Sequence, residues 1–294
     1  MESLIFKSLE KLNLTSLKTR KLYNSRTRDM DSIEVWKDEV SGVIYIDSFY
    51  TGNKTYIDGD YRTDSNLELK SGKPDFENSI DTNRRIKANL KFVAGKNIAD
   101  FGCGNGDFLK NVKPYCESVL GIELQKSFVD SLNQNGIDCV SELSEIENSS
   151  LETIVSFHVI EHLPDPLTTL QKLKSKLRSN GKIIIEVPHA KDFLLSGLSN
   201  ENFKQFTLWS QHLILHTRES LYNFLKFAGF KNIVISGIQR YPLSNHFNWI
   251  VNGMAAGHKS ILSTIDTYNL NIEYQNALSK IDATDTLIAI ASSD

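Results

Sequence analysis

The chain has 294 residues, enough for one α/β domain with a sizeable appendage, and its 33 Lys+Arg against 36 Asp+Glu give a net charge of −3. This balance, without any basic run, argues against a protein that binds nucleic acid or a membrane surface, and no apolar stretch is long enough to span a bilayer. The three cysteines (Cys103, Cys116 and Cys139) form neither an even disulfide set nor a C-x-x-C metal pair, and the charged N-terminus is no signal peptide, so we expect a cytoplasmic protein.

Hydrophobic periodicity divides the chain near residue 80. We expect residues 1–80 to form a small accessory or lid segment, with helical character over 1–22 and two short strands over 33–36 and 43–46. A polar stretch rich in turn residues follows over 51–78, and no chemistry can be identified in it.

From residue 81 onward, strands and helices alternate regularly. Asp81 is expected to cap a helix, and Asp165-Pro166 to open another. Thr217 can N-cap a third, although Ser at position 220 argues against a full capping box there. The expected strands lie at residues 98–101, 119–124, 139–140, 154–159, 182–187, 232–238 and 286–291. This alternation predicts an α/β domain over residues 81–294, with a mainly parallel sheet and helices on both faces.

A glycine-rich loop, D-F-G-C-G-N-G-D over residues 100–107, joins the first of these strands to the next helix. Its glycines let a ligand approach the main chain at the carboxyl end of the strand. Position 107 is Asp where a dinucleotide fingerprint needs Gly or Ala, and its charge would repel a pyrophosphate, which disfavours a nicotinamide dehydrogenase. Asp100 and Asp107 instead suit a cationic group, and Glu123, at the tip of the next strand, can accept both hydroxyls of a ribose.

Four motifs in this order make residues 81–294 resemble the class I S-adenosylmethionine-dependent methyltransferases: D-F-G-C-G-N-G, G-I-E-L, S-F-H-V-I-E-H-L and L-x-S-N-G-K-I-I-I-E-V-P. The resemblance is greatest to the branch with the ubiquinone-biosynthesis O-methyltransferases and the surface-glycan and nucleotide-sugar methyltransferases. It implies a Rossmann-like, seven-stranded, mostly parallel sheet with an antiparallel last strand, and S-adenosyl-L-methionine as the cofactor. The residues that it assigns to cofactor binding are Asp100, Phe101, Gly102, Cys103, Gly104, Gly106, Asp107, Glu123, Leu124, Ser141, Glu142, Phe157 and His158.

Residues 158–162 read H-V-I-E-H and fit the inverted zincin pattern, in which two histidines one helical turn apart hold zinc. Pro164 disfavours a helix beyond a single turn, which argues against a zinc peptidase. Some quinone-pathway relatives bind a divalent cation in the matching segment, with a carboxylate where this chain has His158. Other relatives carry a zinc-binding N-terminal segment, whereas this chain has no cysteine before Cys103. We therefore expect no metal.

The acceptor of the methyl group is expected to be a small molecule. The strand before His158 is not followed by the Asp/Asn-Pro-Pro-aromatic run of the enzymes that methylate amino groups of bases. Long inserts over 190–216 and 239–263 can enclose a small acceptor, and the resemblance favours an oxygen of a sugar or glycan precursor. A phenolic or quinone acceptor, a protein acceptor and a non-catalytic cofactor-binding subunit remain alternatives. His189, with His212 in reserve, is the candidate base for the acceptor hydroxyl.

Overall fold

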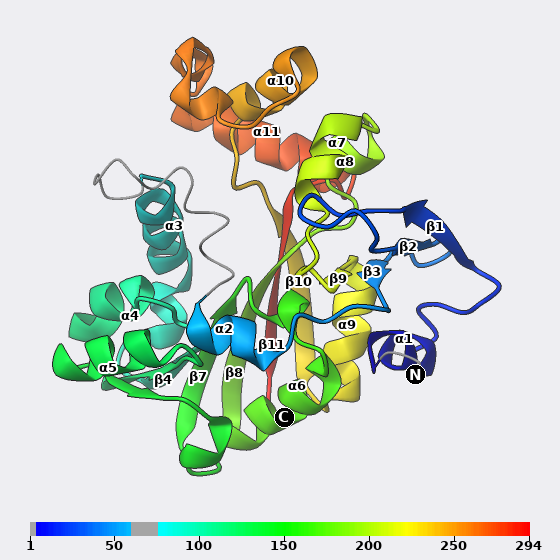
Figure 1. Cartoon of the computed structure of the whole chain (residues 1–294). Coiled ribbons are helices and arrows are strands. Elements are labelled where there is room, and N and C mark those ends of the chain that lie inside the picture. The colour runs from blue at the N-terminus through cyan, green and yellow to red at the C-terminus, as the bar shows by residue number, and fades with distance from the viewer. Residues whose placement is uncertain (1–3, 60–75) are drawn as a thin grey trace.

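The computed structural model describes residues 4–59 and 76–294, and its centre is a seven-stranded sheet in the order β10-β11-β8-β7-β4-β5-β6 (Figure 1). The strands β4 to β8 run parallel to one another, whereas β11 is antiparallel to both β8 and β10. The expected Rossmann-like sheet with an antiparallel last strand is therefore confirmed. Its strands are β4 (Asn97–Phe101), β5 (Ser118–Ile122), β6 (Asp138–Val140), β7 (Leu151–Phe157), β8 (Leu177–Pro188), β10 (Lys231–Ile238) and β11 (Thr286–Ser292).

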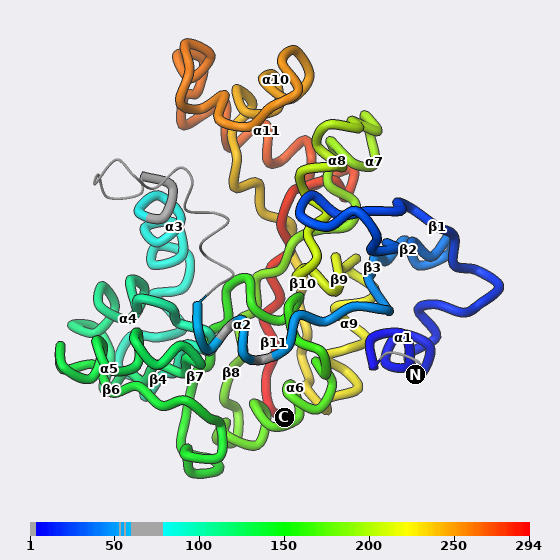
Figure 2. Tube along the Cα trace, viewed as in Figure 1, coloured from blue at the N-terminus to red at the C-terminus, as the bar shows by residue number. Residues whose placement is uncertain are grey.

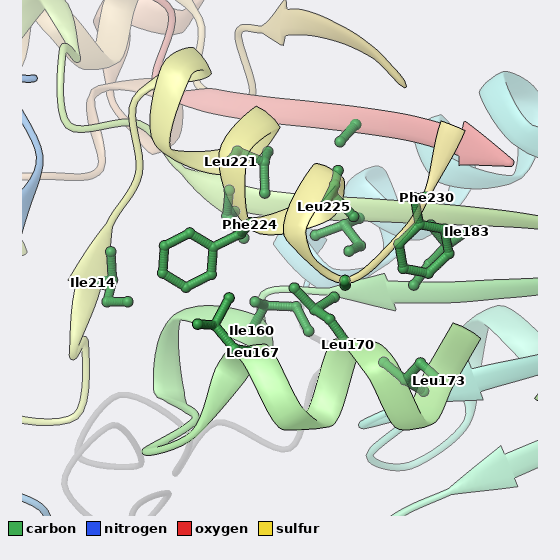
Figure 3. Packing of buried hydrophobic residues seen from close by; sticks show 14 of the residues in the cluster. Ile160, Leu167, Leu170, Leu173, Ile183, Ile214, Leu221, Phe224, Leu225 and Phe230 are labelled. Atoms are coloured by element: carbon green, nitrogen blue, oxygen red, sulfur yellow. The ribbon is translucent and has the colours of Figure 1, made fainter. Parts of the chain in front are cut away.

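Helices cover both faces of this sheet because successive residues of a buried strand point to opposite sides. On β8, Ile183 and Ile185 belong to the same core as the leucines of α6 (Pro166–Lys176) and the apolar face of α9 (Arg218–Phe227). Figure 3 shows Ile183 among these side chains. Ile184 points the other way, into a second core. That core contains the buried residues of α4 (Asp107–Val112) and α5 (Lys126–Gln134), together with the end of α3 (Phe76–Val93).

Two of the three expected helix starts, at Asp165 and Thr217, were correct, whereas the start at Asp81 and the absence of a full capping box at Thr217 were wrong. Asp165 caps α6 as expected, since its side chain accepts a hydrogen bond from the Thr168 amide. The helix α3 begins at Phe76, so Asp81 lies inside it rather than at its N-cap. At α9 the capping box is complete, because the Ser220 hydroxyl accepts from the Thr217 amide at 2.8 Å while the Thr217 hydroxyl accepts from the Ser220 amide.

The N-terminal part of the chain forms a small sheet with a strand from far along the sequence. This N-terminal part contains α1 (Leu4–Lys11), β1 (Arg20–Asn24), β2 (Val35–Asp38), β3 (Ile44–Ile46) and α2 (Asn53–Asp58). The helix expected over 1–22 is thus too long, and much of the stretch 51–78 lies outside the described residues. The sheet order is β1-β2-β3-β9, and β9 (Ile214–Leu215) belongs to the insert after β8. Whether residues 1–80 behave as a separate segment stays a prediction.

Both inserts leave the edge of the central sheet at which its parallel strands end. The first carries α7 (Phe193–Ser196) and α8 (Glu201–Thr207), and the second carries α10 (Leu243–Asn252) and α11 (Tyr268–Lys280). In the trace of Figure 2 they lie at the top, at the end of the strands opposite to the C-terminus. None of the helices in the described part of the chain is long and apolar enough to cross a bilayer.

Candidate active site

A cavity of about 770 Å³ opens at the carboxyl ends of β4, β5 and β7. Doubly wound sheets bind their ligands at this edge. Eight of the residues that the sequence assigned to a cofactor line it together: Phe101, Gly102, Glu123, Leu124, Ser141, Glu142, Phe157 and His158. The remaining five do not line it: Asp100 lies in β4, Cys103, Gly104 and Gly106 lie in the loop, and Asp107 is the first residue of α4.

The glycine-rich loop takes a conformation that side chains would disturb. Gly102, Gly104 and Gly106 all have positive φ angles, of 79°, 55° and 77°. A Cβ atom at Gly102 would collide with the side chain of Val159, which also lines the cavity. These positions therefore require glycine, both for the turn and for the close approach of the loop to the end of β7.

Glu123 fixes the loop from the neighbouring strand. Its side chain is 7% exposed, its Oε2 accepts a hydrogen bond from the Gly104 amide at 2.8 Å, and its Oε1 accepts one from the Gln125 amide at 2.9 Å. Each carboxylate oxygen has a second lone pair. Glu123 can therefore hold the loop and still accept hydrogen bonds from a ligand in the cavity.

The end of β7 presents His158 in a strained conformation. Its φ angle is 56°, which is uncommon for a residue other than glycine, and residues in such sparsely populated conformations cluster at active sites. Its Nδ1 lies 3.2 Å from Glu161 Oε1, and its Nε2 lies 3.1 Å from Nη1 of Arg240. Burial and the charge of Arg240 lower the pKa of His158 well below its usual value, so its ring is neutral at physiological pH.

A cluster of buried charges supports this edge of the sheet. Glu186 of β8 is fully buried and receives a two-pronged interaction from Arg84, at 3.0 and 2.8 Å, and a third bond from Arg85 at 3.2 Å. Burial alone would raise the pKa of Glu186, but the Arg84 bonds and the Arg85 charge hold it below its usual value. Arg240 donates from two nitrogens to one oxygen, Oδ2, of Asp81, and its charge helps to keep the pKa of that carboxyl, despite its burial, at about 2.

Comparison with known proteins identifies the family and the fold. A family described as a methyltransferase domain matches residues 80–235. The chain belongs to this family. Its curated relatives include a tRNA U34 carboxymethyltransferase of Nautilia profundicola, 25% identical over 51% of this chain and 52% of the relative. A ubiquinone biosynthesis O-methyltransferase of Ralstonia nicotianae is 22% identical over 53% of this chain and 71% of the relative.

The solved structures agree on the fold. A SAM-dependent methyltransferase of Archaeoglobus fulgidus superimposes with a TM-score of 0.51 at 17% identity, covering 73% of this chain and 93% of that protein. Among the curated relatives, by contrast, the first is matched over only about half of its length. The family and fold are thus shown, and S-adenosylmethionine is the cofactor of this methyltransferase domain.

The residues of the cavity fit this cofactor. Glu123 has acceptor lone pairs that suit ribose hydroxyls, and Ser141 and Glu142, just after β6, line the same cavity. The assignment of these residues to the ribose and the base stays a prediction. Asp100, 4% exposed near the end of β4, does not itself line the cavity, and its role as the negative charge beside a cationic methionine portion stays a prediction. Burial raises the pKa of Asp100 to about 7, against the opposing charge of Arg85, so this carboxyl is poised to ionise when a cation binds.

The two histidines named as candidate bases lie in different surroundings. His189 is 1% exposed, its Nδ1 lies 2.9 Å from the Thr284 carbonyl, and it does not line the cavity. His212 also lies outside the lining, but its ring is 5.0 Å from that of His162, which does line the cavity. The role of either histidine as a base stays a prediction.

His212 also brings a third group to the H-x-x-E-H segment. Glu161, His162 and His212 each offer a ligand atom within 4.8 Å of the others, which is a donor set that a divalent cation could use. The Nδ1 of His162 lies 2.8 Å from the Gln211 carbonyl, and its Nε2 lies 3.9 Å from Glu161 Oε1. The expectation of a metal-free protein therefore stays a prediction, and this cluster is the place to test it.

Sequence reasoning missed several residues of the site. His162, from the short helical turn after β7 (Ile160–His162), lines the cavity, although the sequence suggested only a zinc ligand there. Tyr50 lines it from the N-terminal segment, in which no chemistry was identified. The charge cluster around Glu186 was missed as well. The local signal for it was the adjacent pair Arg84 and Arg85 in α3, because an arginine that turns toward the protein interior needs a buried acidic partner.

Proposed function

We propose that this chain transfers the methyl group of S-adenosylmethionine to an oxygen of a small acceptor, a hydroxyl of a sugar or glycan precursor. The observation that carries the proposal is the cavity, in which the glycine-rich loop, Glu123 and His158 meet. The two inserts rise from the same edge of the sheet and support an enclosed small-molecule acceptor.

The relatives offer two other acceptors. By their names, some act on tRNA and others in ubiquinone biosynthesis. The net charge of −3 does not favour a polyanionic acceptor such as tRNA. A phenolic hydroxyl remains the main competitor, because its transfer chemistry would use the same cavity.

The residues of the chain mainly bind, orient and exclude water. S-adenosylmethionine, when bound, supplies an already activated methyl group. Glu123 and the glycine-rich loop hold its position, while Phe157, His158 and Tyr50 wall the cavity and reduce the access of water. Of the two candidate bases, His212 has the better support, because its ring lies beside that of His162, which lines the cavity. The Nδ1 of His189, at the start of the first insert, instead lies beside the Thr284 carbonyl.

The test is methyl transfer from isotopically labelled S-adenosylmethionine by the full chain to three acceptor panels: neutral sugars and nucleotide sugars, phenols, and unmodified tRNA. We expect label only in the sugar panel, with the transfer strongly reduced in Glu123→Ala. Transfer to the phenols or to tRNA alone would contradict the sugar proposal and leave the methyltransferase assignment intact. Binding of the cofactor without transfer to any panel would favour a non-catalytic subunit.

A further inference from the structure

Two thiols meet beside the glycine-rich loop. Cys103 lies in that loop, which follows β4, and Cys139 lies on β6. The strand between β4 and β6 is β5, and its Gly121 pairs with Cys139 in the sheet. A Cβ atom on Gly121 would lie 2.8 Å from the Sγ of Cys103 and 2.9 Å from the Sγ of Cys139. The two sulfurs therefore occupy, side by side, the space that a side chain on β5 would fill.

The two thiols interact with each other. A hydrogen bond between them lowers the pKa of Cys139 and raises that of Cys103. The pair therefore gives up its first proton more readily than an isolated buried cysteine, and the thiolate is the form of cysteine that reacts with oxidants. Cys139 is only 6% exposed, whereas Cys103 is half-buried, so a small oxidant reaches the pair from the side of the loop.

The backbones of the two cysteines are held to different degrees. Asn133 of α5 bonds both backbone groups of Cys139: its Oδ1 accepts a hydrogen bond from the Cys139 amide at 2.9 Å, and its Nδ2 donates one to the Cys139 carbonyl at 3.0 Å. Cys103 instead has glycine on either side, the residue type with the fewest conformational restrictions. A force that draws the two sulfurs together will therefore move the loop rather than β6.

A disulfide between the two cysteines would exert such a force. The sulfurs of a disulfide are about 2.0 Å apart, closer than two sulfurs can approach without a bond, so its formation draws Cys103 toward β6. The next residue, Gly104, donates its amide to Glu123 Oε2 at 2.8 Å, and the Gly106 amide donates to the Cys103 carbonyl at 2.9 Å. A displacement of Cys103 therefore disturbs the bonds that shape the loop and attach it to Glu123.

We propose that Cys103 and Cys139 are an oxidation site, at which a hydroperoxide forms a reversible disulfide that weakens the binding of S-adenosylmethionine. One thiolate attacks the O–O bond of hydrogen peroxide and becomes a sulfenic acid, and the released hydroxide takes up a proton to form water. The second sulfur then attacks the sulfenic sulfur and releases a second water. Two thiols are thus oxidised to one disulfide, while the peroxide is reduced by two electrons. The proposal concerns the cofactor and is independent of the acceptor.

The first test treats the full chain with stoichiometric hydrogen peroxide, maps its disulfides by peptide mass spectrometry and titrates S-adenosylhomocysteine by calorimetry. We expect a Cys103–Cys139 linkage and an affinity about tenfold lower, the lower end for one lost hydrogen bond to a charged group, with both changes reversed by dithiothreitol. Cys139→Ser, which cannot form the linkage, should keep its affinity after peroxide. Cys116→Ser is the matched control, since it removes the third cysteine and keeps the pair, and it should respond like the wild type.

A redox titration of the wild type in glutathione buffers gives a second measurement that needs no variant. Because coupling between two equilibria is reciprocal, a tenfold lower affinity of the oxidised chain means that saturating S-adenosylhomocysteine favours the reduced thiols tenfold. This corresponds to a reduction potential about 30 mV less negative with the ligand than without it. The absence of the Cys103–Cys139 linkage, an unchanged affinity of the linked chain, a potential that the ligand does not shift, or an equal loss of affinity in peroxide-treated Cys139→Ser would each overturn the proposal.

Discussion

At the scale of single residues, Glu123 is the most constrained side chain of the cofactor cavity, since it bonds two backbone amides and still faces the ligand. We expect Glu123→Ala to weaken the binding of S-adenosylhomocysteine by about 1.5–3 kcal/mol, the range for hydrogen bonds to a charged group. Calorimetric titration measures this effect, with the exposed Glu117→Ala as the control. The wild type should show no comparable binding of NAD. Unchanged affinity in a folded Glu123→Ala variant would remove Glu123 from the site.

Asp100 gives the site a dependence on pH. Because burial raises its pKa to about 7, the carboxyl is neutral below that pH and charged above it. We expect the affinity for S-adenosylmethionine, whose sulfonium is cationic, to rise as the pH increases through about 7, and the Asp100→Asn variant to lose this rise. S-adenosylhomocysteine lacks the sulfonium charge and should show a shallower profile. Parallel profiles for the two ligands would exclude Asp100 as a partner of the sulfonium.

The base prediction concerns the rate and not the affinity. Removing a general base should lower kcat by about 10²–10⁴-fold and leave cofactor binding intact, because the base acts only on the acceptor. Burial lowers the pKa of His189 to about 4, so a rate that depends on His189 should rise with pH only around that value and be flat at neutrality. The kcat of His212→Ala and His189→Ala tests both candidates. If both keep near-normal kcat, alignment alone or another residue carries the step.

At the scale of elements, α9 shows how a serine completes a capping box. The sequence lacks the usual Glu or Gln at the third helical position, yet the Ser220 hydroxyl reaches the Thr217 amide. We expect Thr217→Ala to lower the free energy of unfolding by about 1 kcal/mol, since it leaves the Ser220 amide without its acceptor. Chemical denaturation measures the change, and Thr217→Ser, which keeps the hydroxyl, should recover most of it. An equal loss in both variants would point to packing of the methyl group instead.

The turn after β7 carries Glu161 and His162, and the first insert carries His212, so these two elements together form the candidate metal site. The sequence predicts a protein without stoichiometric zinc and an activity that survives a chelator. His212 lies close to Glu161 and His162, so these three residues form a possible ligand set. Burial raises the pKa of Glu161 to about 8 when no cation neutralises it. Elemental analysis of the purified chain tests the prediction. One metal ion per chain, lost in His212→Ala, would overturn the prediction.

At the scale of the whole molecule, the sequence revealed the features that are local along the chain. The alternation of strands and helices and the loop over residues 100–107 each depend on neighbouring residues, so the central sheet and the core of the cofactor cavity could be predicted. The contacts that escaped prediction join distant segments. Neither the pairing of Arg84 with Glu186, 102 positions apart, nor the approach of His212 to His162 leaves a periodic trace. The helix α10 was also missed, since its apolar residues serve an insert rather than the main core.

The pairing of β3 with β9 has a consequence for the order in which the protein is made. Ile44 pairs with Leu215, so the ribosome adds 171 further residues after Ile44 before this partner residue exists. At bacterial and eukaryotic elongation rates this delay is about 10–30 seconds. During that time the edge of β3 lacks its neighbour, and an open edge can join strands of other chains. The strand β3 is therefore synthesised long before its sheet can be completed, and a nascent chain stalled before residue 214 would expose an unfinished sheet even if its cofactor loop had formed.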